Sequence, residues 1–318
     1  MDGFMQLTIV SIALSAIVFS CTTSSQEEPR QELSLSKSKQ LILDDYKAEV
    51  EVGRNMAGRL FAFYGEFQDA GLKSYINSVG QYVAKSGDYP DRRYMFGVLD
   101  SDTVNAFACP GGYILVTRGV ISDAKNEAEL AAILGHEAAH VGKMHVFNSL
   151  RSMSKEQVDK AQAEAIANKR PDKHSKARLR PVPEANDSGA MLAKMLTTAS
   201  GAGMGILQAA KVGMGLLLEK GLDKELEFEA DREGVKYAIR AGYEPRALDQ
   251  FLQRLLEQKK KSGVNTVMDM THPSIPDRRK VIAEALNRMS AEQIFGAEGK
   301  ERFEAATAHI ARMGKDSK

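Results

Sequence analysis

The chain is poor in histidine, cysteine and net charge, and these shortages limit what it can be. It holds six histidines and two cysteines among 318 residues, so a metal-binding histidine pattern rarely arises in it by chance. Its 43 Lys and Arg against 42 Asp and Glu leave a net charge of +1, which gives no support to nucleic-acid binding. It lacks a series of long apolar runs, which argues against an integral membrane protein. No tetratricopeptide-like repeat is present, so no dedicated docking array is expected.

Two of the histidines, His136 and His140, form the sequence HEAAH. Residues four apart lie on one face of a helix, one turn above each other, so both rings can bind one zinc ion. Glu137 would lie beside that metal as a potential general base. The alternative is a buried helix with two hydrogen-bonded core histidines.

The residues around this motif predict a helix. Asn126 and Glu129 form an N-cap with its reciprocal cap, and residues 130–134 are apolar and favour helix. We therefore expect a buried helix, as a metal site requires.

A third ligand is expected far along the chain, in residues 225–241 (ELEFEADREGVKYAIRA). Helical geometry places Glu227 and Asp231 on one face, inside an apolar stripe. The opposite, solvated face would hold Glu225, Glu229, Arg232, Glu233, Lys236 and Arg240. Because a buried carboxylate needs a metal or a partner, we predict Glu227 as a zinc ligand and Asp231 as the acceptor that orients a ligating histidine. The alternative is a buried acid paired with an Arg.

HEAAH followed by E-F-E-A-D at 227–231 resembles the gluzincin metallopeptidases of the Ste24 and HtpX type (metallopeptidase family forty-eight). Further segments agree over roughly residues 45–285: VLDSDTVNAFACPGGYILVTRGVI at 98–121, HVGKMH at 140–145, AGYEP at 241–245 and THPSIPDRR at 271–279. The first of these resembles the soluble periplasmic branch. The resemblance implies one zinc ion per chain, held by His136, His140 and Glu227, with Glu137 as the base.

The resemblance also implies a fold and an activity. We expect an α+β, mostly α, zincin-like fold with a small sheet beside the HExxH helix. The implied activity is that of a zinc endopeptidase acting on unfolded or misassembled proteins of the cell envelope. The alternative is a zinc-stabilised chaperone or assembly factor that rarely cuts, although a pure binder has no need of Glu137. An integral-membrane prenyl-peptide protease is disfavoured by the lack of several apolar spans.

The remaining histidines and one arginine complete the candidate site. His272 could donate to the oxyanion, occupy the open zinc position and hold the enzyme inactive, or merely brace a turn before a proline. Arg278 is a further candidate donor to substrate. His145 falls about half a turn off the His136 face and is expected to be structural. His174 and His309 are expected on the surface.

Substrate binding is expected at the edge of the small sheet. Strands are predicted at 95–99, 104–109 and 113–116 from their β-branched and aromatic content. An extended peptide would pair with an edge strand beside the zinc helix. By resemblance, Asn105, Ala106 and Phe107 would line that groove; a core strand followed by a Gly turn is the alternative.

The first 40 residues resemble a bacterial lipoprotein leader. Residues 1–20 are read as a signal peptide ending before Cys21, the lipidation site, and 21–40 as a flexible tether. An uncleaved anchor is the alternative, because the first six residues carry an acid and no Lys or Arg. With Cys21 lipidated, Cys109 has no partner and no intramolecular disulfide is expected.

The leader predicts a location. An Asp retention signal is absent after Cys21, where the chain has Thr22. The expected location is therefore the bacterial periplasm, with the lipid in the outer membrane.

The rest of the chain divides as follows. The metallopeptidase domain is expected at 41–290 and a C-terminal helix at 291–318, with helices at 245–261 and 277–290. Within the domain, 151–188 is a polar insertion and 190–220 a Gly- and Met-rich helical segment, read as a buried or lid-like pair rather than a membrane span.

Overall fold

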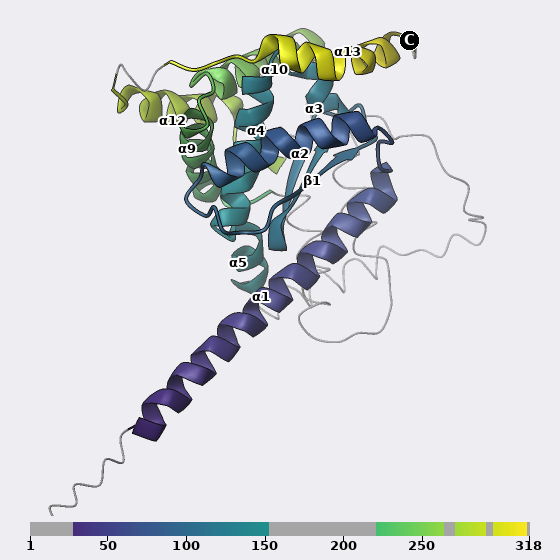
Figure 1. The fold of residues 1–318 in the computed structure, drawn as a ribbon. Helices are drawn as coiled ribbons and strands as arrows, with labels where there is room; N and C mark the ends of the chain where they lie inside the picture. The colour runs from purple at the N-terminus through teal and green to yellow at the C-terminus, as the bar shows by residue number, and fades with distance from the viewer. Residues whose placement is uncertain (1–27, 153–220, 264–270, 291–294, 317–318) are drawn as a thin grey trace, which may run out of the picture. The chain divides into compact units, whose positions relative to one another are not determined.

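The computed structural model describes residues 28–152, 221–263, 271–290 and 295–316 (Figure 1). The chain divides into two units, residues 1–44 and 45–318. Several features predicted from the sequence lie outside the described residues. They are the signal peptide, Cys21, His174, the segment at 190–220 and all but the first two residues of the polar insertion. In the first unit the described backbone is helical from Glu28, where the sequence predicts a flexible tether.

Helices make up most of the described chain, and three strands form one small sheet. The helices are α1 (Glu28–Tyr64), α2 (Ala70–Lys85), α3 (Arg118–Asp123), α4 (Glu127–Gly142), α5 (His145–Ser152), α9 (Lys224–Arg240), α10 (Ala247–Ser262), α12 (Ile275–Asn287) and α13 (Lys300–Asp316). The predicted mostly α fold with a small sheet is confirmed. The C-terminal helix begins at Lys300 rather than at residue 291.

The sheet has the strand order β1-β3-β2. Strand β1 (Met95–Leu99) pairs in parallel with β3 (Tyr113–Thr117), with Met95 opposite Tyr113. Strand β2 (Ala106–Cys109) pairs antiparallel with β3, with Ala106 opposite Val116. The short 3₁₀ turn η1 (Pro110–Gly112) joins β2 to β3, as the Pro-Gly-Gly sequence predicts; Gly111 and Gly112 have φ of 71° and 100°, which only glycine adopts readily.

The two edges of the sheet differ. The β1 edge is covered by the segment before α2, since the amide of Phe67 donates to Val98 and the amide of Asp100 donates to Gly65. Within the described part of the chain, the outer edge of β2 has no partner strand. Its backbone is therefore available to pair with an added strand.

A hydrophobic core lies on each face of the sheet. One core joins the sheet to α2, α4 and α9; it includes Val79, Val98, Ile114, Leu134 and Tyr237. The other packs Phe107 and Leu115 against the second half of α1 and against α5. The sheet is thereby packed on both faces, with α4 on one of them (Figure 1).

Helix α4 is buried along its whole length, from Glu127 to Gly142, as predicted. The side chain of Asn126 caps it by accepting a hydrogen bond from the amide of Glu129 at 2.9 Å. In return, the side chain of Glu129 accepts a hydrogen bond from the amide of Lys125, rather than from the amide of Asn126 as a capping box would have it. This helix is the rigid central element that carries HEAAH.

Helix α9 crosses α4 at two glycines, Gly135 and Gly234. A Cβ atom at Gly234 would lie 2.6 Å from the backbone nitrogen of His136, and one at Gly135 would lie 2.9 Å from the carbonyl oxygen of Gly234. Real Cβ atoms do not approach backbone atoms so closely. The two backbones touch only because neither residue has a side chain, and this contact sets Glu227 and Asp231 opposite the histidines.

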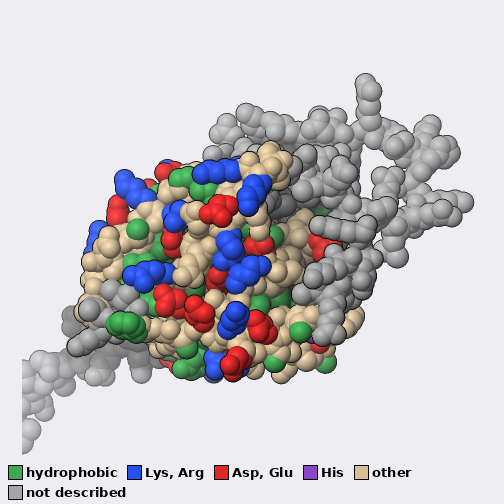
Figure 2. Space-filling model, turned by 90° about the horizontal axis from the view of Figure 1, so that it is seen from above, with side chains coloured by type: hydrophobic (Ala, Val, Ile, Leu, Met, Phe, Trp, Pro, Cys, Tyr) green, Lys and Arg blue, Asp and Glu red, His purple; other side chains and the backbone are tan. Residues whose placement is uncertain are grey.

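Charge is mixed on the described surface. The face in Figure 2 interleaves Lys and Arg with Asp and Glu, and neither sign gathers into one large patch. Among the described helices, none is both long enough and apolar enough to cross a bilayer.

Gly234→Ala tests the helix crossing. The added methyl group would press on the His136 backbone, so the free energy of unfolding should fall by about 1–3 kcal/mol, the usual effect of overpacking. Gly58→Ala is the matched control, because a Cβ there meets nothing within 4 Å and Ala favours a helix by about 0.5–1 kcal/mol. Urea unfolding should separate the two variants; equal stabilities would contradict the crossing.

Candidate metal centre

The structure brings His136 and His140 of α4 together with Glu227 of α9. The two Nε2 atoms lie 3.1 Å apart. Glu227 Oε2 lies 3.6 Å from His136 Nε2, and Glu227 Oε1 lies 3.5 Å from His140 Nε2. All three side chains are buried, and all three present their donor atoms to one point.

These distances fit a zinc ion. Zinc bound tetrahedrally at about 2.0–2.1 Å sets its ligand atoms roughly 3.3 Å apart. In addition, Glu227 Oε2 is buried and accepts no hydrogen bond from the described residues. An unsatisfied buried carboxylate oxygen is costly, and a bound cation removes that cost.

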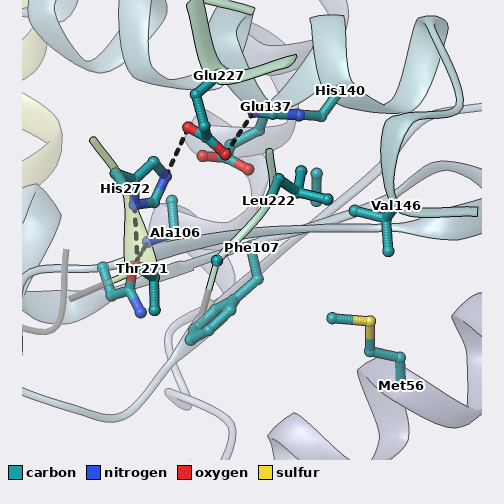
Figure 3. Close-up of a pocket in the computed structure, with 13 residues that line it drawn as sticks. Met56, Ala106, Phe107, Glu137, His140, Val146, Leu222, Glu227, Thr271 and His272 are labelled. Atoms are coloured by element: carbon teal, nitrogen blue, oxygen red, sulfur yellow. Dashed lines mark hydrogen bonds and ion pairs between the residues drawn. The ribbon is translucent and has the colours of Figure 1, made fainter. Parts of the chain in front are cut away.

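His272, which precedes α12, is the fourth residue at this point. Its Nε2 lies 3.5 Å from Glu227 Oε2, and the donor atoms of His136, Glu227 and His272 all lie within 4.8 Å of one another. Figure 3 shows the Glu227 carboxylate pointing between the rings of His140 and His272. The side-chain hydroxyl of Thr271 lies 2.9 Å from His272 Nδ1 and holds the ring from its other side.

The electrostatics of the cluster favour positive charge. Burial alone would lower the pKa of His136, but its contacts with Asp231 and Glu227 outweigh burial and raise that pKa to about 9. Burial alone would raise the pKa of Glu227, but the neighbouring histidines hold it well below its ordinary value. A metal ion supplies the same positive charge that these carboxylates attract.

Glu137 lies beside the cluster and is 4% exposed. Burial raises the pKa of its carboxyl group above the ordinary value. A carboxylate with a raised pKa is better matched to accepting a proton near neutral pH. The arrangement therefore suits Glu137 to the expected role of base.

Asp231 orients His136 and also pairs with an arginine. Its Oδ1 lies 3.0 Å from His136 Nδ1 and accepts a 2.6 Å hydrogen bond from Arg278 Nη2. Burial would raise the pKa of Asp231, yet the Arg278 guanidinium and His136 hold it at about 2. Asp231 therefore contacts a ligating histidine and pairs with an arginine, which are the two alternatives that the sequence leaves open. The predicted contact of Arg278 with substrate stays a prediction.

His145 contacts both His140 and Glu229, and the sequence pattern predicts neither contact. His145 Nδ1 lies 3.0 Å from His140 Nδ1, and His145 Nε2 lies 3.3 Å from Glu229 Oε2. The helical phase used for His145 fails because α4 ends at Gly142 and the chain turns at Met144, where φ is 58°. On the predicted solvated face of α9, Glu233 is instead buried, whereas Glu229 is partly exposed and contacts His145. His309 is half-exposed and pairs with Asp69, in keeping with its predicted surface position.

A pocket of about 70 Å³ opens beside the cluster, with walls of two kinds. One wall is polar and holds Glu137, His140, Glu227 and His272; the other is apolar and holds Met56, Phe107, Val146 and Leu222 (Figure 3). The three predicted groove residues all line this pocket: Asn105, Ala106 and Phe107.

Asn105, like Glu227, lines this pocket and has a buried polar atom without a hydrogen-bond partner among the described residues. It is 1% exposed, and its Oδ1 accepts a hydrogen bond from the amide of Ala106. Its Nδ2 donor has no partner among the described residues. A buried amide donor in the pocket is available to a bound molecule.

Asp231→Asn tests the charge pair behind His136. The change leaves the buried Arg278 without a counter-charge, so we expect the free energy of unfolding to drop by about 3–5 kcal/mol. Asp249→Asn is the control. Asp249 pairs with Arg279, the residue after Arg278, but both side chains are about one-third exposed, so the free energy of unfolding should fall by only about 0–1 kcal/mol. Unfolding measured with a chelator present excludes metal loss as the cause, and similar losses in both variants would overturn this description.

Comparison with known proteins finds relatives that are named as proteases. The Beta-barrel assembly-enhancing protease of Escherichia coli (strain K12) is 27% identical over 267 residues, which cover 83% of this chain and 48% of that protein. The protein of the same name from Yersinia pestis is 30% identical over 219 residues, or 68% of this chain and 39% of that protein. The Mitochondrial metalloendopeptidase OMA1 of Schizosaccharomyces pombe is 26% identical over 255 residues, 80% of this chain and 63% of that protein.

The chain thus spans about half the length of the bacterial relatives. The model of Peptidase family M48 matches residues 71–286, which include every residue of the candidate metal centre. Because this match extends over more than half of the sequence, the chain belongs to peptidase family M48.

Proposed function

We propose that this protein is a zinc-dependent endopeptidase of the bacterial cell envelope that cleaves unfolded or misassembled proteins. The observation that carries the proposal is that Glu137 lines a pocket next to three convergent donor atoms, beside the edge of β2 that has no partner strand among the described residues. A binding protein would need the cluster but not the base.

We infer that one zinc ion is held by His136, His140 and Glu227. When bound there, zinc supplies Lewis-acid chemistry, which acidifies a water molecule and polarises a peptide carbonyl. Asp231 fixes the ring of His136, and Arg278 fixes Asp231 in turn. These buried pairs hold the donor atoms in place before any ligand arrives.

Glu137 moves the proton in the proposed reaction. It takes a proton from the attacking water while the water oxygen bonds to the carbonyl carbon. It then gives this proton to the amide nitrogen as the carbon–nitrogen bond breaks, so that an amine and a carboxylic acid leave. Burial of Glu137 keeps bulk water from competing for the proton.

The polypeptide is proposed to bind along β2. Its backbone would add to the free edge of the sheet, and the amide donor of Asn105 would reach a substrate carbonyl. The apolar wall of the pocket would receive an apolar side chain, which unfolded proteins expose. A cavity of about 70 Å³ is smaller than the roughly 150 Å³ that holds a benzene ring, so it favours small aliphatic side chains over aromatic ones.

The cellular setting is a separate part of the proposal. Similarity to proteases named for enhancing β-barrel assembly supports an envelope location and envelope substrates. Attachment to the outer membrane through a lipid on Cys21 follows from the leader sequence, with a zinc-peptidase domain at 41–290 behind it.

Glu137→Gln tests the activity and its base together. The purified chain with zinc bound should cleave unfolded casein, and the variant should be about 10²–10⁴-fold slower while it keeps its zinc. The variant is nearly isosteric, so its fold should persist. Mass spectrometry of the products should place small aliphatic residues beside the cut. Casein left intact by the zinc-loaded wild type and also by His272→Ala would favour the chaperone alternative.

His272→Ala separates the two active roles proposed for that residue. We propose that His272 occupies the fourth position of the zinc site in the resting enzyme, given its place at the cluster. Its removal should then raise the rate of casein cleavage. His309→Ala, at a half-exposed histidine far along the sequence, should leave the rate unchanged. A fall in kcat of about 10²–10³-fold would instead identify His272 as an oxyanion donor.

A further inference from the structure

His140 makes a second contact through its other ring nitrogen, on the side away from the metal cluster. Its Nε2 faces Glu227 Oε1 at 3.5 Å, and its Nδ1 faces His145 Nδ1 at 3.0 Å. The two rings meet edge to face, with centroids 5.0 Å apart and planes at 79°. His145 Nε2 then faces Glu229 Oε2 at 3.3 Å, and Glu229 Oε1 lies 2.9 Å from Lys143 Nζ.

The positions of the protons along this row of contacts follow from one requirement. A metal at His140 Nε2 takes the lone pair of that nitrogen, so a neutral His140 carries its proton on Nδ1. Among the described residues, the observed partner of His140 Nδ1 is His145 Nδ1, which must therefore be unprotonated to accept that proton. The proton of His145 then lies on Nε2, where Glu229 accepts it. Each donor in the row meets an acceptor.

We propose that His145 and Glu229 are positioning residues that fix the orientation and tautomer of His140 for metal binding. The inference rests on the proposed zinc site. Helix α9 would then orient both ligating histidines of α4 by different means. Asp231 contacts His136 directly, whereas Glu229, two residues earlier, reaches His140 through the inserted ring of His145.

The backbone is built to place this ring. Helix α4 ends at Gly142, and α5 begins at His145. Between them Met144 has a φ of 58°, which is the sole positive value at a non-glycine residue among the described residues. Such a conformation is strained for a side chain like Met and recurs at functional sites. The turn brings His145 back against the helix that it follows, where it is 4% exposed.

The test measures zinc affinity by competition with a chromophoric chelator, using the full chain. His145→Leu removes the acceptor but fills the buried space, and should weaken zinc binding about 10–100-fold. His145→Asn places an amide oxygen close to the position of Nδ1 and should restore affinity to within about threefold of the wild type. Glu233→Gln is the control: it removes a carboxylate of α9 that pairs with Lys236 and is not an observed partner of any histidine.

The outcomes separate this inference from the proposed zinc site. Failure of the wild type to bind zinc would refute the site itself. Zinc bound by wild type and by His145→Leu with equal affinity would refute the role of His145, as would equal weakening in the Leu and Asn variants. If the Leu variant does not fold, nitrogen-15 NMR of the zinc-loaded wild type decides: the proposal requires the proton of His145 on Nε2, and a proton on Nδ1 overturns it.

Discussion

The close crossing of α4 and α9 at Gly135 and Gly234 is the constraint on which the site depends. With the two backbones in contact, three acids of α9 that are two positions apart face α4 and the turn after it. Glu227 reaches the Nε2 atoms of His136 and His140, Glu229 reaches His145, and Asp231 reaches His136 Nδ1. A side chain at either glycine would separate the helices, and these contacts would lengthen together.

Burial of so many charges requires each to have a partner. The carboxylate of Asp231 meets Arg278, and Glu229 meets Lys143 at the partly exposed end of its row. Glu227 Oε2 lacks a hydrogen-bond donor among the described residues, and it belongs to the residue at the centre of the cluster. A cation at this point would complete the charge balance of the interior, and its binding would then stabilise the fold.

Much of the site could be predicted from sequence because it depends on local periodicity. The four-residue spacing of HEAAH places His136 and His140 on one face of a helix, and the same geometry places Glu227 and Asp231 in the apolar stripe of another. The strands follow from their apolar and β-branched residues, and β1 has the predicted bounds, Met95–Leu99.

The rest depends on contacts that no local pattern encodes. Sequence periodicity assumes a continuous helix, so it cannot foresee that Met144 reverses the chain and returns His145 to His140. It sorts α9 into one buried and one solvated face, whereas α9 also contacts the start of α5, which engages Glu229. It treats orientation of a metal ligand and pairing with arginine as alternatives for Asp231, although Oδ1 of Asp231 meets both His136 Nδ1 and Arg278 Nη2.

X-ray absorption spectroscopy at the zinc edge tests the central claim most directly. We expect one zinc ion per chain, with at least two imidazole nitrogens and a carboxylate oxygen at about 2.0–2.2 Å. A third imidazole would fit His272 at the fourth position. A purified, folded chain that binds no zinc, or one whose zinc has fewer than two imidazole ligands, would contradict the central claim.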